Sequence, residues 1–98
     1  MNATRVSAAV VVVFASIATA FAASEPPAGA TSCSGCHPAS AGVQSPVPPL
    51  AGKNAAEIVA QMQAFRAGQR PATVMDRIAK GFSDAEVQAI AAWYAQQH

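Results

Sequence analysis

Two cysteines and a histidine stand close together in the segment CSGCH, at Cys33, Cys36 and His37, and no other cysteine occurs in the 98 residues. The spacing Cys-x-x-Cys-His is the attachment signature of c-type haem. Two thiols at this spacing can form thioethers with the two vinyl groups on one edge of a porphyrin, and the histidine that follows can present its imidazole to the iron. A short helical segment would place all three side chains in this way.

Two other kinds of site use the same residue types. A thiol–disulfide oxidoreductase carries its cysteine pair at the start of a helix in a βαβ setting, and this sequence has no strand-like alternation. A zinc or copper site needs a fourth good ligand, and the one further histidine, His98, stands at the end of the sequence, where we expect it to be solvated. The motif therefore favours haem over disulfide chemistry or another metal.

The sixth ligand of a haem iron decides its use, because an open iron binds oxygen or a small substrate, whereas an iron closed by methionine carries electrons at raised potential. Two methionines beyond the N-terminal segment are candidates. Met62 falls on the apolar face of a predicted helix, where methionine usually fills the core. Met75 lies in a predicted loop past Pro71, far enough from His37 for the chain to cross the haem edge. We predict Met75 as the ligand and Met62 as the alternative.

The first 22 residues have the features of a secretory signal peptide. Arg5 lies in a short head, an apolar run extends from about Val6 to Ile17, and Ala20-Phe21-Ala22 supplies small residues for a signal peptidase. The run is shorter than the ~20 residues that a membrane-spanning helix needs. We expect cleavage after Ala22 or the next residue, a periplasmic location, and no stable membrane insertion. In such a compartment two nearby cysteines seldom remain free thiols.

The rest of the chain divides into a flexible lead-in, residues 23–32, and one domain, residues 33–98. The lead-in is rich in proline and small residues, with room for a helical turn just before Cys33. A domain this small rarely buries enough apolar surface without a disulfide, metal or cofactor. The positive and negative charges of residues 23–98 balance, so we expect neither nucleic acid nor an acidic membrane as a partner.

Two segments carry the periodicity of amphipathic helices. The first runs between Asn54, a helix cap that forms a capping-box-like pair with Glu57, and Gly68, which can end the helix. The second begins at Ser83, which forms a capping box with Glu86. The apolar faces that we expect to point inward contain Ile58, Val59, Met62 and Phe65 in the first helix, and Val87, Ile90, Ala91 and Tyr94 in the second.

The connecting segments are long for so small a domain. Residues 37–52 contain four prolines and are expected to form a loop, and residues 69–80 to form a loop and a possible short helix closed by Gly81. The sequence therefore predicts an all-α fold of about three helices and long loops. Loops of this length argue against a plain helical bundle unless something large fills the centre.

The chain resembles the class I, mono-haem cytochromes c over the length that follows the signal peptide. The segments that carry the resemblance are CSGCH, PPLAG, MQAFRAGQRP, TVM and SDAEVQAIAAWYAQ. It implies a small cytochrome c-like fold wrapped around one covalently attached haem c. It also implies that the Pro48 carbonyl accepts a hydrogen bond from His37 Nδ1, that Leu50 packs on the ring, and that Phe65 lies in the core beside the haem.

A narrower likeness concerns Met75–Gly81, a Met-x-x-Ile-Ala-Lys-Gly run, and the helix after it. This segment is similar to the haem subunits of flavocytochrome c sulfide dehydrogenases. The likeness implies an electron-transfer protein that is not an enzyme by itself. It would take single electrons from a flavoprotein (FAD) subunit that oxidises sulfide and pass them to a soluble acceptor. The docking surface would be the exposed haem edge, rimmed by residues 43–49 and the Met75 segment.

Other functions remain open at this point. A free periplasmic cytochrome that serves a terminal oxidase or another dehydrogenase would have the same motifs. A haem-based ligand binder or peroxidase would require an open iron, which Met75 argues against. A non-haem redox or metal protein is the third option.

Four cations are candidates to pair with a haem carboxylate, although such side chains are usually only solvated: Arg66, Arg70, Arg77 and Lys80.

Overall fold

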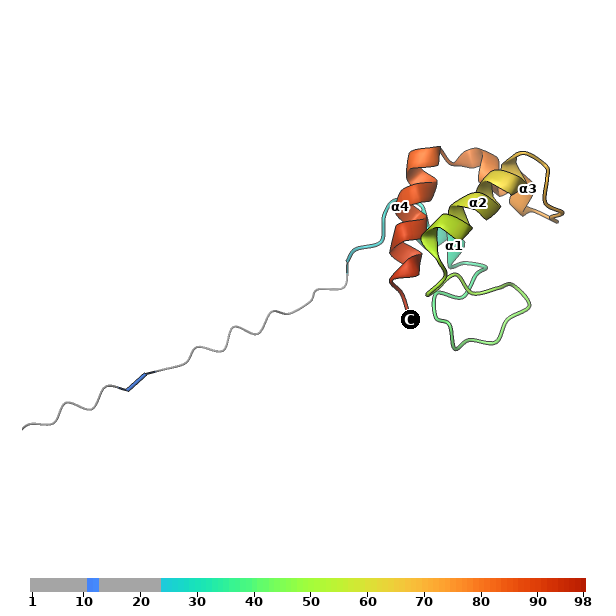
Figure 1. Cartoon of the computed structure of the whole chain (residues 1–98). Coiled ribbons are helices and arrows are strands. Elements are labelled where there is room, and N and C mark those ends of the chain that lie inside the picture. The colour runs from blue at the N-terminus through green and yellow to red at the C-terminus, as the bar shows by residue number, and fades with distance from the viewer. Residues whose placement is uncertain (1–10, 13–23) are drawn as a thin grey trace, which may run out of the picture.

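The structure is a computed structural model that describes residues 11–12 and 24–98. Apart from residues 11 and 12, the predicted signal peptide lies outside the described residues. The described residues contain five helical elements, of which Figure 1 labels the α-helices: α1 (Ala30–Cys33), α2 (Ala55–Arg66), α3 (Met75–Ile78), the 3₁₀ helix η1 (Ala79–Gly81) and α4 (Asp84–Ala95).

The described part of the chain contains no strand, so the predicted all-α fold is confirmed. The two long helices, α2 and α4, are those that the periodicity predicted, and the remaining helical elements are single turns. Within residues 11–12 and 24–98, no helix has both the length and the apolar character needed to cross a membrane.

Helix α2 begins and ends at the residues that the sequence indicated. The side chain of Asn54 accepts a hydrogen bond from the backbone N–H of Glu57, at 3.2 Å. The reciprocal half of the expected box is missing, because the Glu57 carboxylate instead accepts a hydrogen bond from Gln61 Nε2, at 3.1 Å. At the other end, Gly68 adopts a φ of 70°, a left-handed conformation that glycine reaches without strain, and its N–H donates to the carbonyl of Phe65.

Helix α4 has a complete capping box, in which Ser83 and Glu86 each accept a hydrogen bond from the other's backbone N–H. Its inward face is the predicted one, and all four expected residues are buried: Val87, Ile90, Ala91 and Tyr94. This face packs against α2, where Ile58 is buried. The two long helices therefore form the framework on which the loops and short helices are arranged (Figure 1).

The segment before Cys33 is held against α4 although α1 is only one turn long. Ala30 is fully buried, and the Tyr94 hydroxyl donates a hydrogen bond to its carbonyl oxygen, at 2.6 Å. Trp93 Nε1 donates to the carbonyl of Ser24, at 2.9 Å. Gly29, with a φ of 87°, lies so close to Phe82 that a Cβ there would be 2.7 Å from the phenyl ring. These contacts fix the position of α1, and with it the first cysteine.

The long segment between α1 and α2 is a loop, as predicted, and backbone hydrogen bonds close it. The N–H of Leu50 donates to the carbonyl of Pro38, at 3.3 Å, and the N–H of Gly52 donates to the carbonyl of Tyr94, at 3.0 Å. The segment after α2 differs from its prediction in one respect. Met75 is the first residue of α3 and not a loop residue, because the chain turns into a helix directly after Val74.

Candidate functional site

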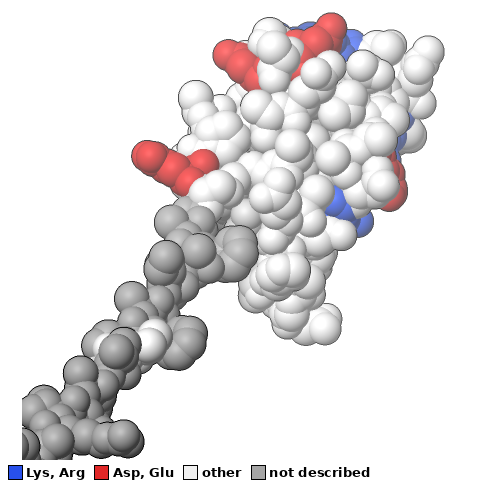
Figure 2. All heavy atoms as spheres, turned by 60° about the vertical axis from the view of Figure 1, so that its left-hand side comes forward, with Lys and Arg blue, Asp and Glu red and all other residues white. Residues whose placement is uncertain are grey.

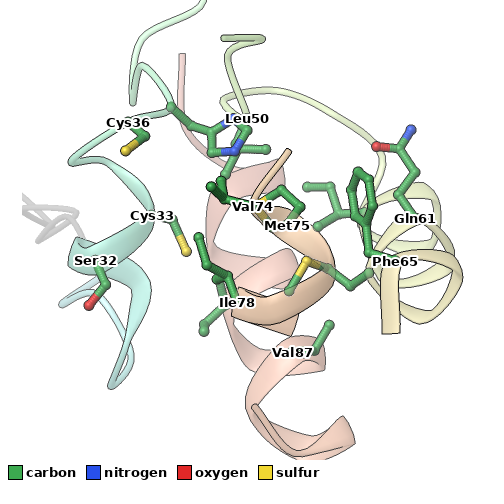
Figure 3. A pocket seen from close by; sticks show the side chains of 14 residues that line it. Ser32, Cys33, Cys36, Leu50, Gln61, Phe65, Val74, Met75, Ile78 and Val87 are labelled. Atoms are coloured by element: carbon green, nitrogen blue, oxygen red, sulfur yellow. The ribbon is translucent and has the colours of Figure 1, made fainter. Parts of the chain in front are cut away.

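A cavity lies between α1, the Leu50 end of the loop, α2, α3 and α4. Figure 3 shows the cavity, with the cysteines on one side and Gln61 and Phe65 on the other. Its lining is mostly apolar and comes from every α-helix of the described chain. The residues are Ser32, Cys33, Cys36, His37, Leu50, Ile58, Gln61, Met62, Phe65, Val74, Met75, Ile78, Val87 and Ile90.

One side of the cavity is formed by the turn that contains the motif. The backbone N–H groups of Cys36 and His37 both donate to the carbonyl of Cys33, at 3.1 and 2.8 Å, so the three side chains are held within one tight turn. Both cysteines are free thiols. Cys33 is half-buried, and desolvation raises the pKa of its thiol although a hydrogen bond to the backbone partly opposes this effect. Cys36 is exposed at the mouth.

The imidazole of His37 has a fixed orientation. Its Nδ1 lies 2.7 Å from the carbonyl oxygen of Pro48, which can only accept a hydrogen bond. Nδ1 therefore carries the proton, and Nε2 keeps a free lone pair. The hydrogen bond expected from the family resemblance is present in the structure. A metal-binding histidine is commonly oriented by such a bond from its other ring nitrogen to a carbonyl.

Both candidate methionines line the same cavity. Met62 comes from the apolar face of α2 and Met75 from the first position of α3, and each is half-buried. The sequence separated the two by placing one on a helix and the other in a loop, but both are helical here. Phe65 lies one turn after Met62 on the same face of α2, as predicted.

A second, more open hollow continues from the first and shares four lining residues with it. It is lined by Cys36, Pro46, Val47, Pro48, Phe65, Arg70, Pro71, Ala72, Thr73, Val74 and Met75. Its volume of about 610 Å³ lies within the ~300–1,000 Å³ range that is usual for small-molecule sites. The two hollows together form a groove between the motif and the Phe65 side of α2.

The structure brings together the residues that the sequence nominated to attach, ligate or contact a haem, but not all of the candidate cations. Pro48 lines the second hollow. Six residues of this set line the first: Cys33, Cys36, His37, Leu50, Phe65 and Met75. Sequence reasoning did not nominate Val74 and Ile78, which line the cavity from the α3 segment. Their spacing of four residues is a helical signal that could have identified them.

These residues fit a haem. Two thiols stand on one side of an apolar groove, an imidazole beside them offers a free nitrogen lone pair, and the thioether side chains of Met62 and Met75 line the same groove. Sulfur and imidazole are the donors that hold haem iron in c-type cytochromes, and the apolar walls suit a porphyrin. Among residues 11–12 and 24–98, no three side chains of His, Cys, Asp or Glu gather to hold a bare metal ion.

No protein-family model matches the chain. Three curated relatives do. The thiosulfate dehydrogenase electron acceptor of Stutzerimonas stutzeri (strain A1501) is 46% identical over 67 residues, which are 64% of this chain and 31% of the relative. The protein of the same name from Thiomonas intermedia (strain K12) is 40% identical over 73 residues, which are 70% of this chain and 34% of the relative.

The third relative is the cytochrome subunit of sulfide dehydrogenase of Chlorobaculum tepidum (strain ATCC 49652 / DSM 12025 / NBRC 103806 / TLS), 36% identical over 63 residues, which are 64% of this chain and 57% of the relative. The match thus spans about a third of two relatives and a little over half of the third. The printed roles of these relatives, a cytochrome subunit and electron acceptors, agree with the helical fold and with a groove that has the donors of a c-type haem. Over the matched residues, the chain is thus similar to a cytochrome subunit and to two electron acceptors.

Proposed function

We propose that this chain binds one haem c in the groove and transfers single electrons. Cys33 and Cys36 would form the two thioethers, and Nε2 of His37 and the sulfur of Met75 would be the protein ligands of the iron. The observation that carries the proposal is the placement of both thiols on one side of an apolar groove, beside an imidazole that Pro48 orients.

The bound iron would supply one-electron exchange between its ferric and ferrous states. The protein's own residues prepare the site for this exchange. The apolar faces of α2 and α4 exclude water, and the Pro48 carbonyl holds His37 in the tautomer that can bind a metal. A methionine ligand favours the reduced state and so raises the potential.

We further propose that the electron donor is a dehydrogenase that acts on a reduced inorganic sulfur compound. The name of one relative supports a sulfide dehydrogenase, in which case the partner is an FAD-containing flavoprotein subunit and this chain is its haem subunit. The names of the other two relatives support a thiosulfate dehydrogenase as a second candidate. In both cases the electrons leave to a soluble acceptor. The alternative is a free carrier for a terminal oxidase or another dehydrogenase.

The rim of the groove supports docking by apolar contact. Val74, which lines both hollows, is about half exposed, and Ile78, which lines the first, is 43% exposed. The five cations and five carboxylates of residues 24–98 balance, and on the face drawn in Figure 2 charged side chains of both signs lie among broad uncharged areas. A partner would therefore be bound chiefly through apolar surface, with little electrostatic steering.

The proposal includes export. Residues 1–22 act as a signal peptide and are removed, which delivers the remaining chain to the periplasm, where the haem is attached. The N-terminal sequence of the exported protein tests this step directly. A protein that keeps residues 1–22 would contradict it.

The first test is expression in a host that can attach haem, followed by mass spectrometry of the denatured protein. We expect the mass of the peptide plus one haem, and the mass of the bare peptide would contradict the proposal. A methionine–iron charge-transfer band in the oxidised spectrum is expected. Carbon monoxide binding to the reduced protein would instead support an open iron and a ligand binder or peroxidase.

The second test identifies the donor. The exported protein is used as bait, flavin fluorescence is read on what copurifies, and sulfide and thiosulfate are added separately to the purified complex. Haem reduction by sulfide with flavin present supports the flavoprotein partner. Reduction by thiosulfate without flavin supports the second candidate, and reduction by neither leaves the free carrier as the function.

A further inference from the structure

The five cations between residues 24 and 98 differ in their relation to the groove. Arg66 is committed elsewhere, because its guanidinium forms a salt bridge with Asp84 and donates to the carbonyl of Phe82. Lys53, Arg77 and Lys80 line neither hollow. Arg70 alone of the five lines the groove, in the wall of its open part.

The position of Arg70 is set by local structure. Its guanidinium carbon lies 5.0 Å from the centre of the Phe65 ring, within the range of a cation–π contact. Pro71 follows it, which biases the backbone of Arg70 towards an extended conformation. The side chain is exposed, and among the described residues it forms no salt bridge with a carboxylate. A positive charge therefore stands at the open end of the groove, placed by Phe65.

Phe65 lies across the cavity from Cys33 and Cys36 (Figure 3). Haem carries its two vinyl groups on one edge and its two carboxylates on the opposite edge. If the two cysteines take the vinyl groups, the carboxylates face the side on which Phe65 and Arg70 lie. A carboxylate placed beside an apolar wall is costly unless a cation or other donor is near it.

We propose that Arg70 is the residue that pairs with a carboxylate of the bound haem. This inference rests on the proposed function, because it takes the thioethers at Cys33 and Cys36 as given. A guanidinium can offer a carboxylate two parallel N–H donors, and stacking on Phe65 holds it in place for this purpose. Arg70 thereby fixes which end of the groove the carboxylates occupy and stabilises their ionised form.

The experiment measures the reduction potential of the haem-loaded protein as a function of pH. The other ionisable groups that line the hollows are Cys33, Cys36 and His37, and all three are residues that the haem would bind. A titration of the potential in the acidic range therefore reports the carboxylates. With Arg70 in place, we expect their pKa to lie below the ordinary value of about 4.3 for a propionate-like carboxyl group. In Arg70→Gln the pKa should rise by about one unit, since a neighbouring arginine lowers a carboxyl pKa by ~1–3 units.

Lys80→Gln is the matched control, because it removes one positive charge from an exposed residue that lines neither hollow. We expect it to leave the carboxylate pKa as in the wild type, and Arg70→Lys to give an intermediate value. The carboxylate bending mode in the resonance Raman spectrum should shift in Arg70→Gln and not in Lys80→Gln.

Two results would overturn the inference and leave the proposed function intact. One is a haem-loaded wild type in which the pKa of the haem carboxylates lies at or above its ordinary value. This result can be observed without any variant. The other is an Arg70→Gln protein whose potential–pH curve and Raman spectrum match those of Lys80→Gln. A wild type without attached haem would contradict the proposed function itself.

Discussion

His37 and Pro48, eleven positions apart in the sequence, meet through a hydrogen bond of 2.7 Å between Nδ1 and the carbonyl oxygen. The loop that separates them is closed by the hydrogen bond from Leu50 to Pro38. The proline-rich loop thus places the backbone carbonyl of Pro48 beside the imidazole of His37. The bond selects the tautomer of His37, and the remaining nitrogen can bind a metal.

Replacement of the predicted sixth ligand should change the potential. Met75→Ala opens the coordination position, and we expect the reduction potential to fall by roughly 0.1–0.3 V, within the ~0.8 V range that axial ligands set. The methionine–iron band should disappear, and the reduced variant should bind carbon monoxide. Met62→Ala is the control, since Met62 lines the same cavity. The reverse pattern, with the band lost only in Met62→Ala, would move the ligand to Met62.

Loss of one thiol should prevent a stable haem protein. A serine hydroxyl does not form the thioether, so Cys36→Ser can keep at most one covalent bond to the haem. We expect the yield of haem-loaded protein to fall strongly, as measured by absorbance and mass. Ser40→Ala, an exposed change in the following loop, should mature normally. Equal yields from the two variants would argue that Cys36 is not an attachment point.

Gly29→Ala should destabilise the protein. The new methyl group would lie 2.7 Å from the Phe82 ring, and the φ of 87° at this residue disfavours any side chain. We expect the free energy of unfolding to fall by about 2 kcal/mol or more, from strain and overpacking together. Gly42→Ala is the control, since no atom lies within 4 Å of a Cβ there. Denaturant unfolding of the haem-loaded proteins measures the stability of both variants. Similar unfolding midpoints would contradict a close Gly29–Phe82 contact.

The Tyr94 hydroxyl should contribute to stability through Ala30. Tyr94 is fully buried and donates to the Ala30 carbonyl, at 2.6 Å. Tyr94→Phe leaves that carbonyl without its partner, and we expect a loss of about 1–3 kcal/mol in the free energy of unfolding. Hydrogen exchange in residues 30–33 should accelerate if the bond anchors α1. Unchanged exchange there would mean that α1 is held by other contacts.

The same residue predicts an alkaline limit to stability. Burial raises the pKa of Tyr94 above its ordinary value of about 10. The unfolded chain therefore releases the phenolic proton at a lower pH than the folded protein. The contribution of Tyr94 is fully present below about pH 10 and is lost as the pH rises through the folded-state pKa. The stability difference between wild type and Tyr94→Phe should shrink above pH 10, and a difference that stays constant would contradict this account.

Local chemistry determined much of this protein from the sequence alone. The spacing of Cys33, Cys36 and His37 identified the motif, because a covalent haem demands those residues within one turn. The caps at Asn54 and Ser83 and the apolar spacing of α2 and α4 identified the long helices, because both depend only on neighbours three or four positions away.

Contacts between distant segments were decided by the tertiary structure. The sequence could not place Gly29 against Phe82 or connect Trp93 to Ser24, since each pairing depends on how the loops return to the two long helices. It also placed Met75 in a loop, whereas packing beside α2 turns that segment into α3. Short helices of this kind have little stability of their own and form because tertiary contacts hold them.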